Sequence, residues 1–124
     1  MMYKILIVDD EQNLRLLYKK EFEKEGYEVI LAKSGEEALR KFQEAAPHLV
    51  ILDIKMPGLD GVETMSKMLS IDNKTPVILN TAYASYQDNF TTWAADAYVV
   101  KSSDMGELRN RVREILAERY GGQE

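Results

Sequence analysis

The stretch HLVILDIKMPGLDG, residues 48–61, determines how the rest of this chain is interpreted. Residues 48–52 form a short, mostly apolar run, which is typical of a strand covered on both faces. The run ends at a carboxylate, Asp53, and Pro57 and Gly58 then prevent the strand from continuing. We interpret Asp53 as a group held rigidly at the edge of a sheet, with a loop that turns away and leaves it accessible.

Apolar runs and amphipathic segments alternate along the whole chain. Strands are expected at residues 4–8, 28–32, 48–52, 76–80 and 97–100. A helix is expected after each of them, although the segment 85–95 is polar and only weakly helical. This alternation favours an α/β domain with a parallel sheet covered on both faces. Because parallel crossovers are right-handed, we expect a flavodoxin-like (βα)5 doubly wound sheet with strand order 2-1-3-4-5.

Start and stop signals support these helices. Gly26 is expected to end the first one. Three pairs match the capping-box pattern at helix starts: Ser34 with Glu37, Asp60 with Glu63, and Asp104 with Glu107. The expected buried stripe of the first helix consists of Leu14, Leu17, Tyr18 and Phe22. Leu16 lies off that stripe and is expected to face solvent.

Composition excludes several classes of function. The chain has 124 residues and a net charge of −5, which argues against direct binding of nucleic acid. It has no cysteine and one histidine, so thiolate metal sites, thiol catalysis and multi-histidine metal sites are excluded. No apolar run is long enough to span a membrane, and we expect a cytoplasmic protein. We expect one domain over residues 1–120, with residues 121–124 as a tail or the start of a linker.

Polar residues gather where the expected strands end. Asp9 and Asp10 follow the first strand, Asp53 the third, Thr81 the fourth and Lys101 the fifth. In order 2-1-3-4-5 the first and third strands are neighbours at the switch point, where open α/β sheets bind ligands. Three carboxylates there repel one another, and a hard divalent cation such as Mg²⁺ relieves the repulsion. With Lys101 and Thr81 beside the cation, the residues match a phosphoryl-transfer site that has a carboxylate nucleophile.

Four stretches carry a resemblance to a known family. They are ILIVDDE, LVILDIKMPGLDG, VILNTAYA and ADAYVVK, and they span almost the whole chain in order. The chain resembles the receiver domains of two-component response regulators. The resemblance implies that Asp53 accepts a phosphoryl group and that Thr81 and Lys101 contact it. It also implies that Asp10, Asp53 and the backbone carbonyl of Lys55 bind Mg²⁺ (or Mn²⁺), with Asp9 acting through water.

The resemblance also implies partners and a switch. The phosphodonor would be a histidine kinase or a histidine phosphotransfer protein, docked on the first helix near Leu16. The output would pass through the face made by segment 85–95, strand 97–100 and the last helix, with Tyr98 as the aromatic that follows phosphorylation. Phe90 and Trp93 would lie in the core or on this output face. A downstream protein or output domain would read the face, and a phosphorylation-dependent dimer is possible.

One departure and several alternatives stay open at this stage. The family usually has Lys-Pro with a cis peptide at the end of the fifth strand, whereas this chain has Lys101-Ser102. A cofactor-binding flavodoxin-like module lacks its phosphate cradle here. A haloacid-dehalogenase-like phosphatase would need an Asp where Lys55 stands. A pseudo-receiver scaffold without phosphotransfer is the remaining alternative. Tyr98 could be plain packing, and His48 is expected to be structural or solvent-facing.

Overall fold

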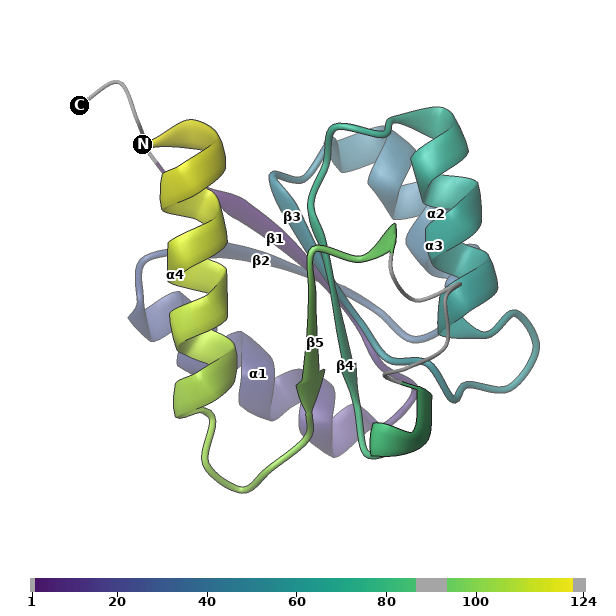
Figure 1. Cartoon of the computed structure of the whole chain (residues 1–124), viewed down its shortest axis with the longest axis horizontal. Coiled ribbons are helices and arrows are strands. Elements are labelled where there is room, and N and C mark those ends of the chain that lie inside the picture. The colour runs from purple at the N-terminus through teal and green to yellow at the C-terminus, as the bar shows by residue number, and fades with distance from the viewer. Residues whose placement is uncertain (1, 87–93, 122–124) are drawn as a thin grey trace.

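The computed structural model of the chain describes residues 2–86 and 94–121. The strands are β1 (Lys4–Val8), β2 (Glu28–Ala32), β3 (Leu49–Leu52), β4 (Val77–Thr81) and β5 (Ala97–Val100). The helices are α1 (Gln12–Lys24), α2 (Gly35–Ala45), α3 (Gly61–Ile71), the short 3-10 helix η1 (Ala84–Tyr86) and α4 (Gly106–Tyr120). Helix α4 corresponds to the helix that the sequence predicts after the fifth strand (Figure 1).

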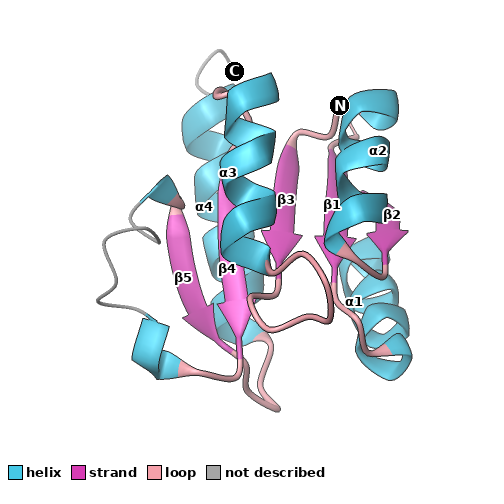
Figure 2. Cartoon of the chain, turned by 90° about the vertical axis from the view of Figure 1, so that its right-hand side faces the viewer, coloured by secondary structure: helices cyan, strands magenta, loops and turns pink. Residues whose placement is uncertain are grey.

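The five strands form one parallel sheet in the order β2-β1-β3-β4-β5, as predicted. Helices α1 and α4 cover one face, and α2 and α3 cover the other (Figures 1 and 2). Successive strand residues point to opposite faces: Ile5 and Ile7 join the α1/α4 layer, whereas Leu6 and Val8 join the α2/α3 layer. Because both layers are apolar, the strands appear in the sequence as continuous apolar runs.

Two strands begin one residue later than expected. β3 starts at Leu49 rather than His48, and β4 covers 77–81 rather than 76–80. Pro76 has no N–H and cannot donate to a neighbouring strand, although its carbonyl accepts from the Val50 N–H at 3.0 Å. The shift places Thr81 at the last position of β4.

Two of the three expected caps are confirmed. The Ser34 hydroxyl accepts from the Glu37 N–H at 3.1 Å, and the Asp60 carboxylate accepts from the Glu63 N–H at 2.9 Å. The expected cap by Asp104 is wrong, because the buried Met105 occupies the capping position of α4. The Asp104 carboxylate instead accepts from Gly106 N–H, two residues ahead, and closes a turn before the helix.

The stripe of α1 is narrower than expected. Tyr18 and Phe22 are buried and Leu14 is half-buried, at a spacing of four residues. Leu16 is 54% exposed, as predicted, but Leu17 is 44% exposed and does not join the core. The expected helix over 85–95 falls mainly on residues 87–93, which lie outside the described residues, as do Phe90 and Trp93.

Candidate functional site

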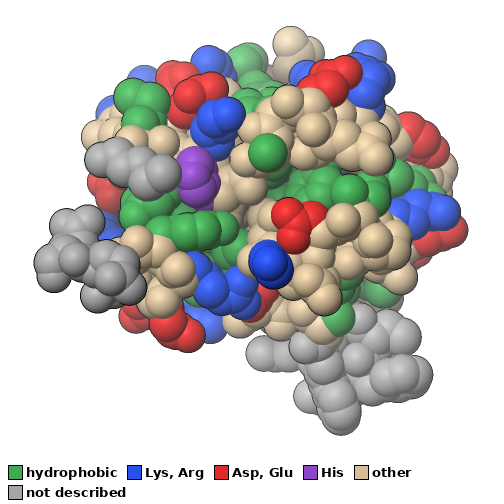
Figure 3. Space-filling view, turned by 90° about the horizontal axis from the view of Figure 1, so that it is seen from above, with side chains coloured by type: hydrophobic (Ala, Val, Ile, Leu, Met, Phe, Trp, Pro, Cys, Tyr) green, Lys and Arg blue, Asp and Glu red, His purple; other side chains and the backbone are tan. Residues whose placement is uncertain are grey.

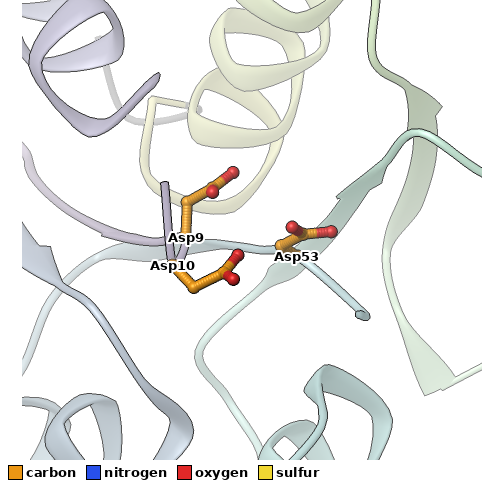
Figure 4. A group of neighbouring side chains, drawn as sticks. All are labelled: Asp9, Asp10 and Asp53. Carbon is orange, nitrogen blue, oxygen red and sulfur yellow. The ribbon is translucent and has the colours of Figure 1, made fainter. Parts of the chain in front are cut away.

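Three carboxylates meet at the edge of the sheet where the strands end. Asp9 and Asp10 follow β1, and Asp53 follows β3. One carboxylate oxygen from each lies within 4.8 Å of the others (Figure 4). β1 and β3 are hydrogen-bonded neighbours, so the topology alone brings together residues more than forty positions apart. The predicted convergence of these three residues is confirmed.

Lys101, which the sequence predicts beside this cluster, lies against it in the structure. Its Nζ donates to Asp9 Oδ2 at 2.7 Å and to Asp53 Oδ2 at 3.0 Å. The backbone N–H of Lys101 donates to the carbonyl of Thr81 at 2.7 Å, which joins the ends of β4 and β5. The ammonium group thus bridges two of the three carboxylates.

Burial and charge act in opposite directions on these groups. Burial raises the pKa of the Asp53 carboxyl above its ordinary value, although the hydrogen bond from Lys101 lowers it and Asp9 raises it further. Burial alone would lower the pKa of the Lys101 ammonium, but its bonds to Asp9 and Asp53 outweigh burial and raise that pKa. Lys101 is therefore charged at neutral pH, whereas ionised Asp53 is destabilised relative to an exposed aspartate.

Asp9 and Asp10 differ in what they can still bind. Asp9 is buried, and both of its oxygens are engaged: Oδ1 accepts from the Glu11 N–H at 2.9 Å, and Oδ2 accepts from Lys101. Asp10 is exposed, and among residues 2–86 and 94–121 it makes no hydrogen bond or ion pair. Asp10 is therefore the carboxylate that is freest to coordinate a cation.

Thr81 and Tyr98 are connected through Tyr83. Thr81 is fully buried at the end of β4, and its hydroxyl accepts a long hydrogen bond of 3.4 Å from the Tyr83 N–H. The hydroxyl of the half-buried Tyr98 donates to the Tyr83 carbonyl. The two predicted switch residues thus contact the same residue in the loop after β4.

Gly61 is a site residue that sequence analysis missed. A Cβ atom at this position would lie 1.9 Å from the Asp53 carbonyl oxygen, and the Gly61 N–H donates to the Ile54 carbonyl at 2.8 Å. The start of α3 therefore packs directly against the backbone of Asp53. Glycine at the first position of a helix, directly after its cap, was the signal, because glycine is a poor helix former.

The loop between β3 and α3 turns as expected. Gly58 has a φ of +78°, which other residues rarely adopt. Lys55 is exposed in this loop, two residues after Asp53, and its predicted role as a carbonyl ligand stays a prediction. No cis peptide bond occurs among the described residues, so the peptide between Lys101 and Ser102 is trans.

His48 lies at the opposite end of the strands from the acidic cluster, directly before β3. Its Nδ1 accepts from the Lys4 N–H at 2.9 Å, and its ring makes edge contacts with Tyr3 and Tyr120. Burial, followed by the charge of Lys4, lowers the pKa of His48. Figure 3 views this end of the sheet and shows the histidine at the surface beside hydrophobic and basic side chains. His48 also lines a pocket of about 900 Å³. These contacts support the expected structural role.

Residues 5–113 match the family described as the response regulator receiver domain. The chain belongs to this family. Its sheet order and its acidic cluster are those of a receiver domain, a phosphorylation-dependent switch of two-component signalling. Such a domain is a phosphoacceptor rather than an enzyme that acts on a separate substrate. The family match overrides the flavodoxin-like cofactor module and the phosphatase as interpretations.

Curated relatives include full regulators and a single-domain protein. The receiver is 39% identical to the regulatory protein AtoC of Escherichia coli over 115 residues, which are 91% of this chain and 25% of that protein. It is 38% identical to the sporulation initiation phosphotransferase F of Bacillus subtilis, again over 91% of this chain but over 93% of that protein. The chain thus spans a quarter of the first relative and nearly all of the second.

One solved relative is known both with an inorganic ligand and with a partner protein. The receiver is 47% identical to the response regulator TrrA of Thermotoga maritima, whose crystal structure is a complex with Mg²⁺-BeF. The match has a TM-score of 0.90 and covers 93% of this chain and 100% of that one. TrrA has also been solved with the histidine kinase ThkA, with a TM-score of 0.88, over 93% of this chain and 99% of that one. In residues 2–86 and 94–121 of the receiver, every helix is too short or too polar to cross a membrane.

Proposed function

We propose that Asp53 accepts a phosphoryl group from a histidine kinase or a histidine phosphotransfer protein. One observation carries the proposal: the Asp53 carboxylate is buried at a strand end, 3.0 Å from the Lys101 ammonium and clustered with Asp9 and Asp10. In the transfer, an Asp53 oxygen forms a bond to phosphorus as the bond from phosphorus to the donor's imidazole nitrogen breaks. The bonding electron pair stays on that nitrogen.

Lys101 and Thr81 contact the transferred phosphoryl oxygens. Lys101 already reaches the Asp53 carboxylate, so a small displacement brings its ammonium onto a phosphoryl oxygen. Thr81 ends the neighbouring strand β4, where its hydroxyl can donate to a second oxygen. Lys101 neutralises part of the negative charge that builds up on the phosphoryl oxygens during transfer, and Thr81 donates a hydrogen bond to one of them. Stabilising such charge is usually the largest single contribution to catalysis.

The donor set fits a hard divalent cation, Mg²⁺ or Mn²⁺. The cluster offers only carboxylate oxygens as ligands, which a hard cation prefers. Asp10 is exposed and has no partner among the described residues, so its carboxylate is open to coordination. Asp10, Asp53 and the carbonyl of Lys55 would hold the ion, with Asp9 acting through water because both of its oxygens already accept hydrogen bonds. Bound there, the cation neutralises the developing charge on the phosphoryl oxygens.

Helix α1 is the proposed docking surface for the phosphodonor. It starts two residues after Asp10, and Leu16 and Leu17 are exposed on it. The structure of TrrA with ThkA supports a histidine kinase as the partner class. A histidine kinase takes its phosphoryl group from ATP, so a kinase donor would place the receiver, residues 1–120, in the cytoplasm. A downstream protein or output domain would read the phosphorylated state, with dimerisation as a further possible response.

The output follows from the contacts of Tyr83. A phosphoryl oxygen that draws in the Thr81 hydroxyl competes with the 3.4 Å bond from Tyr83 N–H. Tyr83 also accepts from Tyr98, so a shift of this loop changes the position of Tyr98 on β5. Phosphorylation would then shift the population between two arrangements of the face that contains segment 85–95, β5 and α4. Residues 87–93 of this face lie outside the described residues.

Incubation with acetyl phosphate and Mg²⁺ tests the proposal. Wild type should gain one hydroxylamine-sensitive phosphoryl group by intact-protein mass, and Asp53→Asn should gain none. Asp104→Asn is the matched control, because Asp104 is exposed and asparagine can still accept from the Gly106 N–H. An undiminished phosphoryl signal in Asp53→Asn would refute the assignment. A wild type that neither gains phosphate nor responds to beryllium fluoride would favour the pseudo-receiver scaffold.

A further inference from the structure

A buried polar pair lies within the otherwise apolar α1/α4 layer. Asn80 and Tyr18 are 3% and 5% exposed, and Asn80 Nδ2 donates to the Tyr18 hydroxyl oxygen at 3.1 Å. The bond joins β4 to α1. Tyr18 belongs to the same layer as Ile78 and Val99. Replacing both members of such a pair by apolar groups of similar shape is often neutral for stability, so folding alone does not require the pair.

The pair lies against the residues of the phosphorylation site. Burial raises the pKa of the Tyr18 phenol above its ordinary value, and the hydrogen bond from Asn80 lowers it. Asn80 directly precedes Thr81, whose carbonyl accepts from the Lys101 N–H. Tyr18, Asn80 and Lys101 line one small hollow beneath the end of β5.

A lysine side chain needs support to act at one position. Its four-carbon stem is flexible, and the ammonium at its end is a compact charge without a preferred direction. In this receiver the ammonium must reach Asp9, Asp53 and then a phosphoryl oxygen, and a displacement of about 1 Å can strongly reduce a transfer rate. Lys101 lines the same small hollow as Tyr18 and Asn80, so these two side chains are placed where they can restrict the lysine.

We infer that Tyr18 and Asn80 form a positioning pair, which holds Lys101 in place for phosphoryl transfer to Asp53. The inference rests on the proposed function and adds two residues to it. The hydrogen bond keeps the phenol from rotating into the hollow and maintains the distance between α1 and β4. The pair touches neither the metal ligands nor the phosphoryl group and acts only through Lys101.

Single substitutions of either partner test the inference. Tyr18→Phe removes the hydroxyl, and Asn80→Leu removes the donor but keeps the number and branching of the side-chain heavy atoms. Each should slow phosphorylation by acetyl phosphate about three- to tenfold, the size expected when one buried hydrogen bond is lost. Tyr27→Phe is the control, because Tyr27 packs against the same layer and on Phe22 and is not among the residues that line the hollow beside Lys101. It should phosphorylate at the wild-type rate.

The decisive measurement is the same substitution in a Lys101→Met background. If Tyr18 acts through Lys101, Tyr18→Phe should have no further effect on the slow residual rate of Lys101→Met. An equal effect in both backgrounds, or a wild-type rate for both Tyr18→Phe and Asn80→Leu, would overturn the inference. If one of these two variants does not fold, the other carries the test. Phosphorylation of wild type in the same assay separates a failure of this inference from a failure of the proposed function.

Discussion

Lys101→Met should destabilise the metal-free receiver by about 3 kcal/mol at pH 7. The ammonium lies 2.7 Å from Asp9 and 3.0 Å from Asp53, and the three side chains are only 14%, 2% and 7% exposed. Removing one partner of a buried ion pair typically costs about 3–5 kcal/mol, because the remaining charge is left without compensation. We expect a cost at the lower end of this range, because Asp53 can take up a proton in the variant and so lose its uncompensated charge.

The loss should depend on pH in a defined direction. The pKa of Lys101 is raised in the folded state, so its contribution is present below its unfolded pKa and is lost only as pH rises through the folded one. Lys101 therefore stays charged between about pH 4 and pH 8. The folded pKa of Asp53 is also raised, so protonation of Asp53 favours the native state at acid pH. Without the Lys101 bond that pKa rises further, and the deficit of the variant should shrink as pH falls from 7.

Chemical denaturation with a chelator present measures this effect. Unfolding free energies of wild type and Lys101→Met are compared at pH 7 and at pH 5, and Lys20→Met serves as the control. Lys20 is exposed and forms no ion pair among the described residues, so its loss removes the same charge at negligible cost. Equal stability of wild type and Lys101→Met at pH 7, or a deficit that grows toward acid pH, would contradict the ion-pair account.

Three other substitutions test separate parts of the site. Asp10→Asn should raise the melting temperature in chelator, because it relieves the repulsion between the three carboxylates. It should also reduce the stabilisation of the fold by Mg²⁺, and an unchanged Mg²⁺ titration would exclude Asp10 as a ligand. Gly61→Ala should cost about 1–3 kcal/mol of stability and slow phosphorylation, because its Cβ would meet the Asp53 carbonyl; a wild-type denaturation curve would show that the loop relaxes freely. Thr81→Ala should leave Asp53 able to accept phosphate but reduce the amide shifts that beryllium fluoride causes over residues 94–100; shifts as large as in wild type would exclude Thr81 from the coupling.

The sheet and the acidic cluster could be predicted because they follow from local pattern and topology. Continuous apolar runs identify strands with two buried faces, and the right-handed crossover rule leaves few strand orders. Once β1 and β3 are neighbours, Asp9, Asp10 and Asp53 must meet at one edge. No side-chain detail is needed for that conclusion, which is why it survives errors of one residue in the strand boundaries.

Contacts between side chains that are far apart in the sequence could not be predicted from it. Leu17 and Tyr18 both fit a helical stripe, and only the position of α1 over the sheet exposes the first and buries the second. The hydrogen bond between Tyr18 and Asn80 joins residues 62 positions apart, so no local sequence pattern predicts it. The close approach of Gly61 to Asp53 likewise depends on where α3 starts relative to β3.

The position of Lys101 explains how one phosphoryl group can alter a distant face. Before phosphorylation the ammonium is divided between Asp9 and Asp53, and the Thr81 hydroxyl accepts from the loop at Tyr83. A phosphoryl group on Asp53 carries roughly two negative charges and several strong acceptor oxygens in place of one carboxylate charge. In the proposed function it would therefore attract Lys101 away from Asp9 and Thr81 away from Tyr83. Since Tyr98 donates to the same Tyr83, the proposed function predicts that the loop and β5, the edge strand of the sheet, would respond together to a change at Asp53.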